Sequence, residues 1–312
     1  MSKNLKTFFI INPKAGGGKA DRRWPRIRET LRTGGFDGFE EVFTEATGHA
    51  TELATEALRN NFEMVVAVGG DGTIHEVVNG FFHQGTLIKT GACLGILSLG
   101  RGSDLIRALG RSQKWEEQLR LLYGKETRMI DLGKIAYLAP DGRRRERYFV
   151  NIADCGIVGD VLQRLGQFPG FLGGTIAYLG SSLESFLLYR NKKVTITIDG
   201  EKLEPRRACA VIVANGQSFG GGLKVAPKAE IDDGLLDILI VADFHLLDFV
   251  LALPRLYAGT IDRSRSSKII YRKAKKVHVA SEEKVLLDVD GEQPGLLPAA
   301  FEIVPKGLAV KA

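Results

Sequence analysis

The sequence has few cysteines and lacks any long apolar run. Cys93, Cys155 and Cys209 are the only three cysteines in 312 residues, and their wide spacing matches no metal-ligand pattern. No apolar run approaches the ~20 residues that a membrane-spanning helix requires. Residues 1–4 lead directly into a strand pattern and not into a signal peptide. We therefore expect a protein of the reducing cytoplasm.

A strong charge of one sign is also absent. The formal net charge is only +6, and the basic residues are spread along the chain. This balance favours an anionic partner surface only mildly, and a solvated exterior accounts for it equally well. The length exceeds that of one average domain, and 44% hydrophobic residues are ample for buried cores. Two domains are therefore expected.

Strand and helix patterns alternate up to about residue 127 and then change. Strands are predicted at 7–11, 41–44, 64–68 and 93–99, each followed by a helix pattern, which implies a parallel sheet covered on both faces. From residue 128 onward short strand patterns follow one another, interrupted by predicted helices around 175–189 and 245–257. This change predicts an α/β N-terminal domain, 1–127, and a β-rich antiparallel C-terminal domain, 128–297. The strands expected there are 130–138, 148–153, 194–198, 208–214 and 235–241.

The stretch 64–76 joins a buried strand to a helix through a glycine-rich turn. Gly69, Gly70 and Gly72 let the backbone turn sharply and leave no Cβ to block a ligand. Asp71 stands at the carboxyl end of the strand, where open α/β sheets bind ligands. Thr73 is expected to cap the helix, whose N–H groups favour an anion. The turn suits a phosphate or a metal bridged by Asp71, although a plain connection with a solvated Asp71 has the same pattern.

Two further turns repeat this strand-to-helix arrangement. Residues 12–19, Asn-Pro-Lys-Ala-Gly-Gly-Gly-Lys, follow the first strand but lack the spacing of a Walker phosphate loop. Residues 100–104, Gly-Arg-Gly-Ser-Asp, follow the strand at 93–99. The Arg101 guanidinium could bond a phosphate, and a solvent-facing arginine fits this sequence as well.

Five separated motifs resemble the diacylglycerol kinase-type catalytic family, which includes bacterial lipid kinases and sphingosine and ceramide kinases. They are Asn-Pro-x-Ala-Gly at 12–16, Gly-Gly-Asp-Gly-Thr at 69–73, the Gly-x-Gly-x-Asp frame at 100–104, the stretch 215–237, and Asp-Gly-Glu at 290–292. At 101 and 103 the chain departs from the threonine and asparagine usual in the family. The more distant NAD kinases and phosphofructokinases carry a related Gly-Gly-Asp-Gly. The resemblance implies their type of parallel sheet, with 298–312 returning to the first domain.

The resemblance also implies an ATP-dependent lipid kinase with ATP and Mg²⁺ as cofactors. It makes Asp290 the general base, with Glu292 beside it, and brings Asp71 to Mg-ATP. It places a structural Mg²⁺ on Asp233 and on the carbonyls of Glu230 and Leu235, oxygen ligands that suit a hard cation. The nucleotide-contacting residues that it implies are Asn12, Pro13, Lys14, Ala15, Gly16, Thr44, Gly69, Gly70, Gly72, Thr73, Glu76 and Arg101.

The expected acceptor is a membrane lipid with a hydroxyl group: a diacylglycerol, phosphatidylglycerol or a sphingoid base. A protein without a permanent anchor would reach it by peripheral contact with an anionic membrane at its inner face, using basic residues at 143–147, Arg190, Lys192 and Lys193. The apolar segment 168–172 is either a packed loop or a lip that admits an acyl chain. The arginines at 143–147 are expected at a hairpin tip. No nucleic-acid partner is expected, and a homodimer is compatible with this interpretation.

Two other functions fit parts of the sequence. An NAD kinase-like enzyme would share the first domain, but the β-rich half contains no Ser-Thr-Ala-Tyr-type stretch and does contain Asp-Gly-Glu. A non-catalytic nucleotide- or lipid-binding protein would explain the altered 100–104 loop. Against that alternative, Asp71, Asp233 and Asp290 are all present.

Overall fold

The computed structural model describes residues 5–312 except 37, 101, 166–183, 186 and 221. The chain divides into an N-terminal unit, Met1–Leu132 with Pro305–Ala312, and a C-terminal unit, Gly133–Val304. The sequence led us to expect the divisions near residues 127 and 298. Two strands, β7 (Thr127–Leu138) and β17 (Leu296–Lys311), contain the points at which the chain passes from one unit to the other.

The N-terminal unit is built on a parallel sheet with strand order β2–β1–β3–β6. The end of β17 extends this sheet, because Ala309 and Val310 pair in parallel with Cys93 and Leu94 of β6. The remaining elements are β1 (Thr7–Ile11), α1 (Ala15–Thr33), β2 (Glu40–Phe43), α2 (His49–Arg59), β3 (Met64–Gly69), α3 (Asp71–Gly80), β4 (Phe82–His83), β5 (Thr86–Leu87), β6 (Cys93–Ser98), α4 (Asp104–Ala108) and α5 (Trp115–Tyr123).

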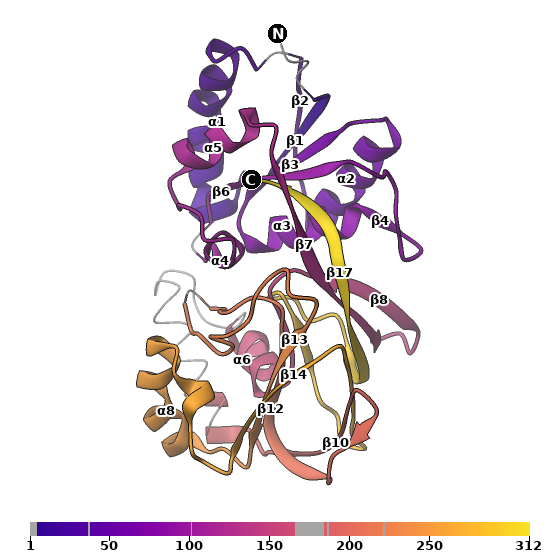
Figure 1. The fold of residues 1–312 in the computed structure, drawn as a ribbon, viewed down its shortest axis with the longest axis vertical. Coiled ribbons are helices and arrows are strands. Elements are labelled where there is room, and N and C mark those ends of the chain that lie inside the picture. The colour runs from indigo at the N-terminus through magenta and orange to yellow at the C-terminus, as the bar shows by residue number, and fades with distance from the viewer. Residues whose placement is uncertain (1–4, 37, 101, 166–183, 186, 221) are drawn as a thin grey trace. The chain divides into compact units, whose positions relative to one another are not determined.

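Helices cover both faces of this sheet, as the strand compositions predicted. Strands β1, β3 and β6 are buried along their whole length, which requires apolar residues on both faces. Phe9 of β1 packs against Trp24 of α1, and Leu119 of α5 belongs to the same cluster. Helices α2 and α3 lie on the other side of the sheet in Figure 1 and contact each other. The expected parallel α/β domain is confirmed.

The C-terminal unit contains antiparallel strands in two sheets. One sheet holds β8, β7, β17, β15, β10 and β11, the other holds β16, β9, β12, β13 and β14, and β10 joins them by pairing with β12. One apolar core contains residues of both sheets, such as Val279, Phe301 and Ile238. The remaining elements are β8 (Arg144–Phe149), β9 (Ile152–Gly156), α6 (Ile157–Leu165), β10 (Lys192–Ile198), β11 (Glu201–Lys202), β12 (Arg206–Ala214), β13 (Leu236–Ala242), α8 (Leu246–Ala258), η2 (Ile261–Arg263), β14 (Ile269–Ala274), β15 (Lys276–Ala280) and β16 (Leu287–Val289).

A second apolar cluster lies on the outer face of the β9–β12–β13 sheet. Ile212 of β12 and Leu239 of β13 belong to it together with Val161 of α6 and Leu256 of α8. Because Val211 and Val213 of β12 belong to the first core, β12 is buried on both faces. The antiparallel β-rich domain expected from the sequence is therefore confirmed, with two helices added to one of its faces. None of the helices described in either unit is both long and apolar enough to cross a membrane.

Two local predictions in this unit were wrong. The run at 148–153 is not one strand, because β8 ends at Phe149 and β9 begins at Ile152. Of the stretch 143–147 expected at a hairpin tip, residues 144–147 belong to β8 instead. The turn is at 140–142, just before Arg143, and the bond from the Gly142 N–H to the Ala139 carbonyl (2.9 Å) closes it. The apolar segment 168–172 and most of the helix expected around 175–189 lie outside the described residues.

Candidate active site

The turn between β3 and α3 is pressed against the turn that follows β6. The Gly69 carbonyl accepts hydrogen bonds from the N–H groups of Leu99 (2.7 Å) and Gly100 (3.2 Å). A Cβ on Gly100 would lie 2.6 Å from the Cα of Gly70, and a Cβ on Gly69 would lie 2.3 Å from Thr73 Oγ1. Both distances are too short for real atoms. Gly100 therefore allows the two turns to touch at the carboxyl edge of the sheet, and Gly69 leaves room for the Thr73 side chain of its own turn.

Asp71 is held by the loop that follows β6. Its Oδ1 accepts a hydrogen bond from the N–H of Asp104 (2.9 Å), the first residue of α4. A Cβ on Gly102 would lie 2.3 Å from Asp71 Oδ2, so that glycine leaves the room that the carboxylate occupies. The structure therefore joins Gly-Gly-Asp-Gly-Thr to the 100–104 loop. Arg101, for which a phosphate contact was expected, lies outside the described residues.

Thr73 does not cap α3, contrary to the expectation. The N-cap is Gly70, and it has no side-chain capping bond. Thr73 Oγ1 instead accepts a hydrogen bond from Asn12 Nδ2 (3.0 Å). The Oδ1 atom of the same Asn12 side chain accepts a hydrogen bond from the Lys14 N–H (3.0 Å). The Asn12 side chain thus ties the β1–α1 loop to α3. A Cβ on Gly72 would meet nothing within 4 Å, so the start of α3 is open at this position.

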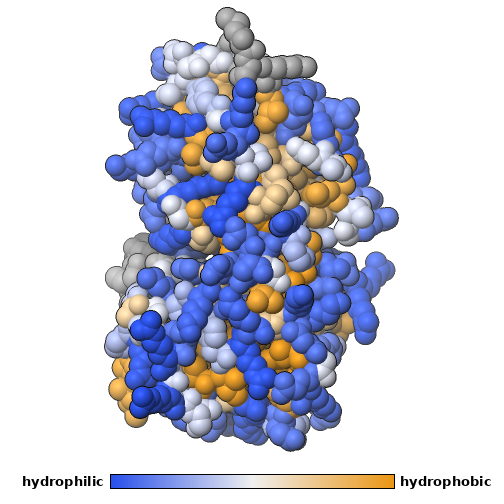
Figure 2. Space-filling model, viewed as in Figure 1, coloured by the Kyte–Doolittle hydropathy of each residue, from blue (hydrophilic) through white to orange (hydrophobic). Residues whose placement is uncertain are grey.

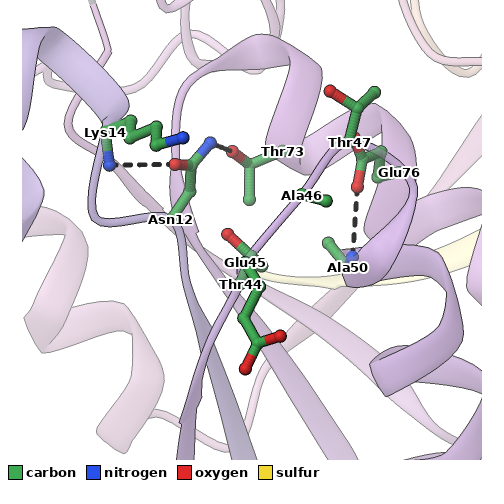
Figure 3. A pocket seen from close by; sticks show the side chains of 9 residues that line it. All are labelled: Asn12, Lys14, Thr44, Glu45, Ala46, Thr47, Ala50, Thr73 and Glu76. Carbon is green, nitrogen blue, oxygen red and sulfur yellow. Dashed lines mark hydrogen bonds between the residues drawn. The ribbon is translucent and has the colours of Figure 1, made fainter.

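A polar pocket of about 130 Å³ lies in the N-terminal unit (Figure 3). Five of the expected nucleotide-contacting residues line it: Asn12, Lys14, Thr44, Thr73 and Glu76. The others described, Pro13, Ala15, Gly16, Gly69, Gly70 and Gly72, do not. The pocket is completed by residues that were not predicted, namely Glu45, Ala46, Thr47 and Ala50.

Glu76 connects two walls of this pocket, since its Oε2 accepts a hydrogen bond from the Ala50 N–H (3.1 Å) in the first turn of α2. The sequence did indicate that residues 45–50 belong to this pocket. They follow Thr44 at the carboxyl end of β2, and the carboxyl ends of parallel strands share one edge of a sheet.

The loop after β1 adopts a conformation that depends on glycine. Gly16, Gly17 and Gly18 have φ values of 63°, 72° and 80°, in the left-handed region that other residues avoid. A Cβ on Gly16 would also lie 2.3 Å from the Leu99 carbonyl oxygen. Both the backbone conformation and the close approach to the end of β6 therefore exclude a larger residue at Gly16.

In the C-terminal unit, Asp290 and Gly291 form a two-residue turn after β16. Their φ values are 50° and 90°, and Val289 and Glu292 exchange hydrogen bonds across the turn (2.8 and 3.0 Å). The Asp290 carboxylate accepts three backbone N–H bonds, from Val150 (2.8 Å), Asn151 (3.1 Å) and Ile152 (3.0 Å). These bonds explain why β8 and β9 are separate strands. Glu292 forms an ion pair with Arg147 of β8.

A buried acidic pair precedes this turn. Asp154 of β9 is opposite Asp288 of β16, and both are buried. Burial, together with the neighbouring Asp288 charge, raises the pKa of Asp154 well above its ordinary value. Asp288 Oδ1 accepts the Gly291 N–H (2.8 Å), so the pair is connected to the Asp290 turn through the backbone. The sequence analysis missed Asp154, for which the sequence carries no distinctive signal.

Asp233, the expected ligand of a structural Mg²⁺, already has a cationic partner. Its Oδ2 lies 2.6 Å from Lys273 Nζ, and that ammonium lies 3.6 Å from Oδ2 of the buried Asp237. Burial opposes the charge of Lys273, but the hydrogen bond to Asp233 and the nearby carboxylates outweigh it and raise the pKa of Lys273. Asp233 Oδ1 accepts the Leu235 N–H (3.0 Å).

The Asp233 carboxylate thus pairs with an ammonium in this structure, and we assign no step to a metal there. The Mg²⁺ site made by Asp233 and the carbonyls of Glu230 and Leu235 stays a prediction. Among the described residues, no group of three or more His, Cys, Asp or Glu side chains is arranged to hold a metal ion.

Comparison with known proteins gives two family matches that together cover most of the chain. Residues 6–135 match the diacylglycerol kinase catalytic domain, and residues 152–312 match the YegS C-terminal NAD kinase beta sandwich-like domain. A diacylglycerol kinase of Bacillus subtilis (strain 168) is 30% identical over 296 residues, covering 94% of this chain and 91% of that protein. A diacylglycerol kinase of Staphylococcus carnosus (strain TM300) is 28% identical, with 94% and 90% covered.

Solved structures show the same fold. A crystal structure of a diacylglycerol kinase from Bacillus anthracis str. Sterne has a TM-score of 0.73 at 24% identity, covering 100% of this chain and 98% of that chain. An NAD kinase from Archaeoglobus fulgidus in complex with ATP has a TM-score of 0.53 at 15% identity, covering 98% and 93%. The likeness to NAD kinases is thus one of fold, whereas the sequence matches extend over nearly the whole chain. The chain belongs to the diacylglycerol kinase family of lipid kinases.

Proposed function

We propose that the protein transfers the γ-phosphoryl group of Mg-ATP to a hydroxyl group of a membrane lipid at the inner face of the membrane. In this step the lipid oxygen forms a bond to the γ-phosphorus, the bond from that phosphorus to the β–γ bridging oxygen breaks, and ADP leaves. The proton of the lipid hydroxyl passes to the Asp290 carboxylate. The acceptor is a diacylglycerol, phosphatidylglycerol or a sphingoid base.

The polar pocket beside α3 supports the nucleotide part of this proposal. Lys14 can neutralise phosphate charge, and the open start of α3 at Gly72 offers N–H groups and the positive end of a helix dipole. Asp71, positioned by the Asp104 N–H, would bind the Mg²⁺ that enters with ATP. Phosphoryl transfer depends mainly on such positioning and charge stabilisation.

The rigid attachment of Asp290 supports its role as the base. A general base must be held within hydrogen-bond reach of the proton that it accepts. Three backbone N–H bonds fix both oxygens of this carboxylate, and the Asp290 N–H donates in turn to the Ile152 carbonyl (2.9 Å). The carboxylate is therefore oriented before any substrate arrives.

The choice of a lipid as the acceptor rests on an apolar pocket in the C-terminal unit. It lies over the outer face of β12 and β13, and all of its lining residues are apolar, including Val161, Ile212, Leu239, Phe249 and Leu256. A soluble nucleotide acceptor such as NAD would leave its polar groups unpaired among these side chains, which is costly. The pocket, of about 90 Å³, would take the end of an acyl chain, whose burial there is favourable.

The test is a kinase assay with radiolabelled ATP over lipids dispersed in detergent micelles, with diacylglycerol, phosphatidylglycerol, a sphingoid base and NAD as acceptors. We expect label in at least one lipid and none in NAD. Label in NAD without lipid would overturn the proposal in favour of an NAD kinase. ATP binding with no transfer to any acceptor would favour a non-catalytic binding protein.

A further inference from the structure

Helix α8 of the C-terminal unit is apolar on nearly all sides. Asp248 and Arg255 are its only charged residues among thirteen. One side of the helix faces inward, where Phe249, Ala252 and Leu256 line the apolar pocket. A helix that is apolar all round is normally enclosed by protein or in contact with lipid.

The other side of α8 is nevertheless exposed. Leu247, Val250, Leu251 and Tyr257 have exposed fractions of 70%, 50%, 68% and 60%, and Pro254 is exposed between them. Leu247, Val250, Leu251 and Pro254 follow the spacing i, i+3, i+4 and i+7, so they form one stripe along the helix. We call these four residues and Tyr257 the α8 face. Figure 2 shows apolar side chains at the lower left, where Figure 1 places α8.

Three arginines lie on α8 and on the segment that follows it. Arg255 is one turn beyond Leu251 on the helix, and the segment after the helix carries the exposed Arg263 and Arg265. Two acidic residues of the same region are neutralised by lysines, since Asp248 pairs with Lys268 (2.8 Å) and Asp262 pairs with Lys228 (2.9 Å). A third, Asp243, is exposed before the helix with His245 as its neighbour (3.7 Å). Three arginines therefore outnumber the one aspartate that no lysine neutralises, and the net charge beside the apolar stripe is positive.

We propose that the α8 face docks on an anionic lipid bilayer. The apolar side chains enter the boundary between head groups and acyl chains, and the three arginines lie against the anionic head groups, as in interfacial amphipathic helices. The partner is argued from the proposed function, whose acceptor lies in a membrane, and from the charge around the stripe. Because the inner side of the same helix lines the apolar pocket, docking here brings that pocket to the membrane surface.

The proposal moves membrane contact away from the basic residues expected at 143–147. In β8 two of those arginines already have acidic partners, Arg145 with Asp141 (2.7 Å) and Arg147 with Glu292. They also lack an exposed apolar stripe of the α8 kind, since the described residues 139–147 include no large exposed apolar side chain.

The test measures binding of the full chain to sedimented vesicles of phosphatidylcholine with and without phosphatidylglycerol. Leu251→Gln should weaken binding roughly tenfold, as expected for losing a buried leucine, and Leu247→Gln with Leu251→Gln should weaken it further. Arg263→Gln with Arg265→Gln should weaken binding only to the anionic vesicles, by about fivefold for each charge. The matched control is Met129→Gln, an exposed apolar residue of the N-terminal unit (40%), which should change nothing.

Lipid phosphorylation in detergent micelles, measured for the same variants, separates this proposal from the proposed function. Docking is overturned if the leucine variants bind vesicles like the wild type, even if they phosphorylate lipid. It is also overturned if they convert a dimer into a monomer in analytical ultracentrifugation, since a second copy would then cover the face. Normal docking without phosphorylation of any lipid would leave this proposal standing and remove the proposed function.

Discussion

The C-terminal unit contains the tripeptide Asp-Gly-Glu twice, at 199–201 and at 290–292, and the two copies fold alike. In both turns the aspartate and glycine are left-handed, with φ values of 47° and 88° in one and 50° and 90° in the other. Asp199 accepts the N–H groups of Lys275 and Lys276, as Asp290 accepts those of residues 150–152. The glutamate of each turn also forms an ion pair with an arginine, Glu201 with Arg272 (2.9 Å) and Glu292 with Arg147.

The two copies differ in their surroundings. Asp199 is exposed and binds the link between β14 and β15, whereas Asp290 is half-buried and binds the loop between β8 and β9. Only the second copy is preceded by a buried acidic pair, Asp288 with Asp154. Asp-Gly-Glu is therefore a stable turn in its own right. Any catalytic role must come from where the turn is placed.

The sharpest test of this comparison replaces the aspartate of each turn with asparagine, which exchanges one carboxylate oxygen for an NH₂ group. Asp290→Asn should reduce turnover by roughly 10²-fold or more, as expected for a lost general base. Both oxygens of Asp290 accept backbone N–H bonds, so its asparagine variant presents an NH₂ group to a donor and should also lose about 1–3 kcal/mol of stability. Asp199→Asn can keep its Oδ1 on the N–H groups of Lys275 and Lys276, so its structural cost is smaller, and its turnover should match the wild type.

Turnover at saturating ATP, ATP affinity and the melting temperature should be measured for both variants well below the melting temperature. Equal losses of turnover in the two variants would show that both turns act only through stability. A normal rate in Asp290→Asn would remove Asp290 from the mechanism.

A smaller difference in turnover is expected between variants of the two glutamates. Glu292→Gln should lower turnover about tenfold, because Arg147 loses its charged partner at the end of β8, next to the loop that Asp290 binds. Glu201→Gln removes an ion pair in which the glutamate side chain is 62% exposed, and such pairs contribute little. Steady-state rates of the two variants give the comparison, and a rate loss in Glu201→Gln as large as that in Glu292→Gln would contradict it.

The last difference concerns the pH dependence of stability. The raised pKa of Asp154 means that the folded protein retains a proton which the unfolded chain releases near its ordinary pKa of 3.8. The free energy of unfolding should therefore fall as the pH rises above 3.8, by about 1.4 kcal/mol per pH unit, until the folded pKa is passed. Asp154→Asn cannot ionise, so its urea-unfolding free energy should be flatter over this range. Asp199→Asn should keep the wild-type slope, and an unchanged slope in Asp154→Asn would refute the assignment.

Much of the N-terminal unit could be predicted from the sequence because its signals are local. Buried parallel strands appear as continuous apolar runs, and the glycines at 69, 70 and 100 mark the turns by their composition. The same local reasoning failed for Thr73, because its hydroxyl bonds Asn12, which is 61 positions away in the sequence. Propensity favours a cap there, but the packing of two turns decides the bond.

The C-terminal unit was harder to predict because its decisive contacts join distant residues. The break between β8 and β9 depends on Asp290, about 140 positions later in the chain. The ammonium beside Asp233 comes from Lys273, 40 positions later. Asp-Gly-Glu occurs at 199–201 as well as at 290–292, and the motif alone does not tell which of the two turns is exposed.

The end of β17 has a consequence for how the protein is made. Ala309 and Val310 supply the pairing partner of β6, and Lys311 Nζ bonds the Gly124 carbonyl (2.6 Å). During synthesis the first 132 residues leave the ribosome with this sheet edge still unpaired, and it stays so until residues 305–312 have been translated. An open, apolar strand edge invites pairing with other chains. A fragment that stops at Leu132 should therefore aggregate when produced alone, and supplying residues 305–312 as a separate peptide should improve its yield of dispersed protein.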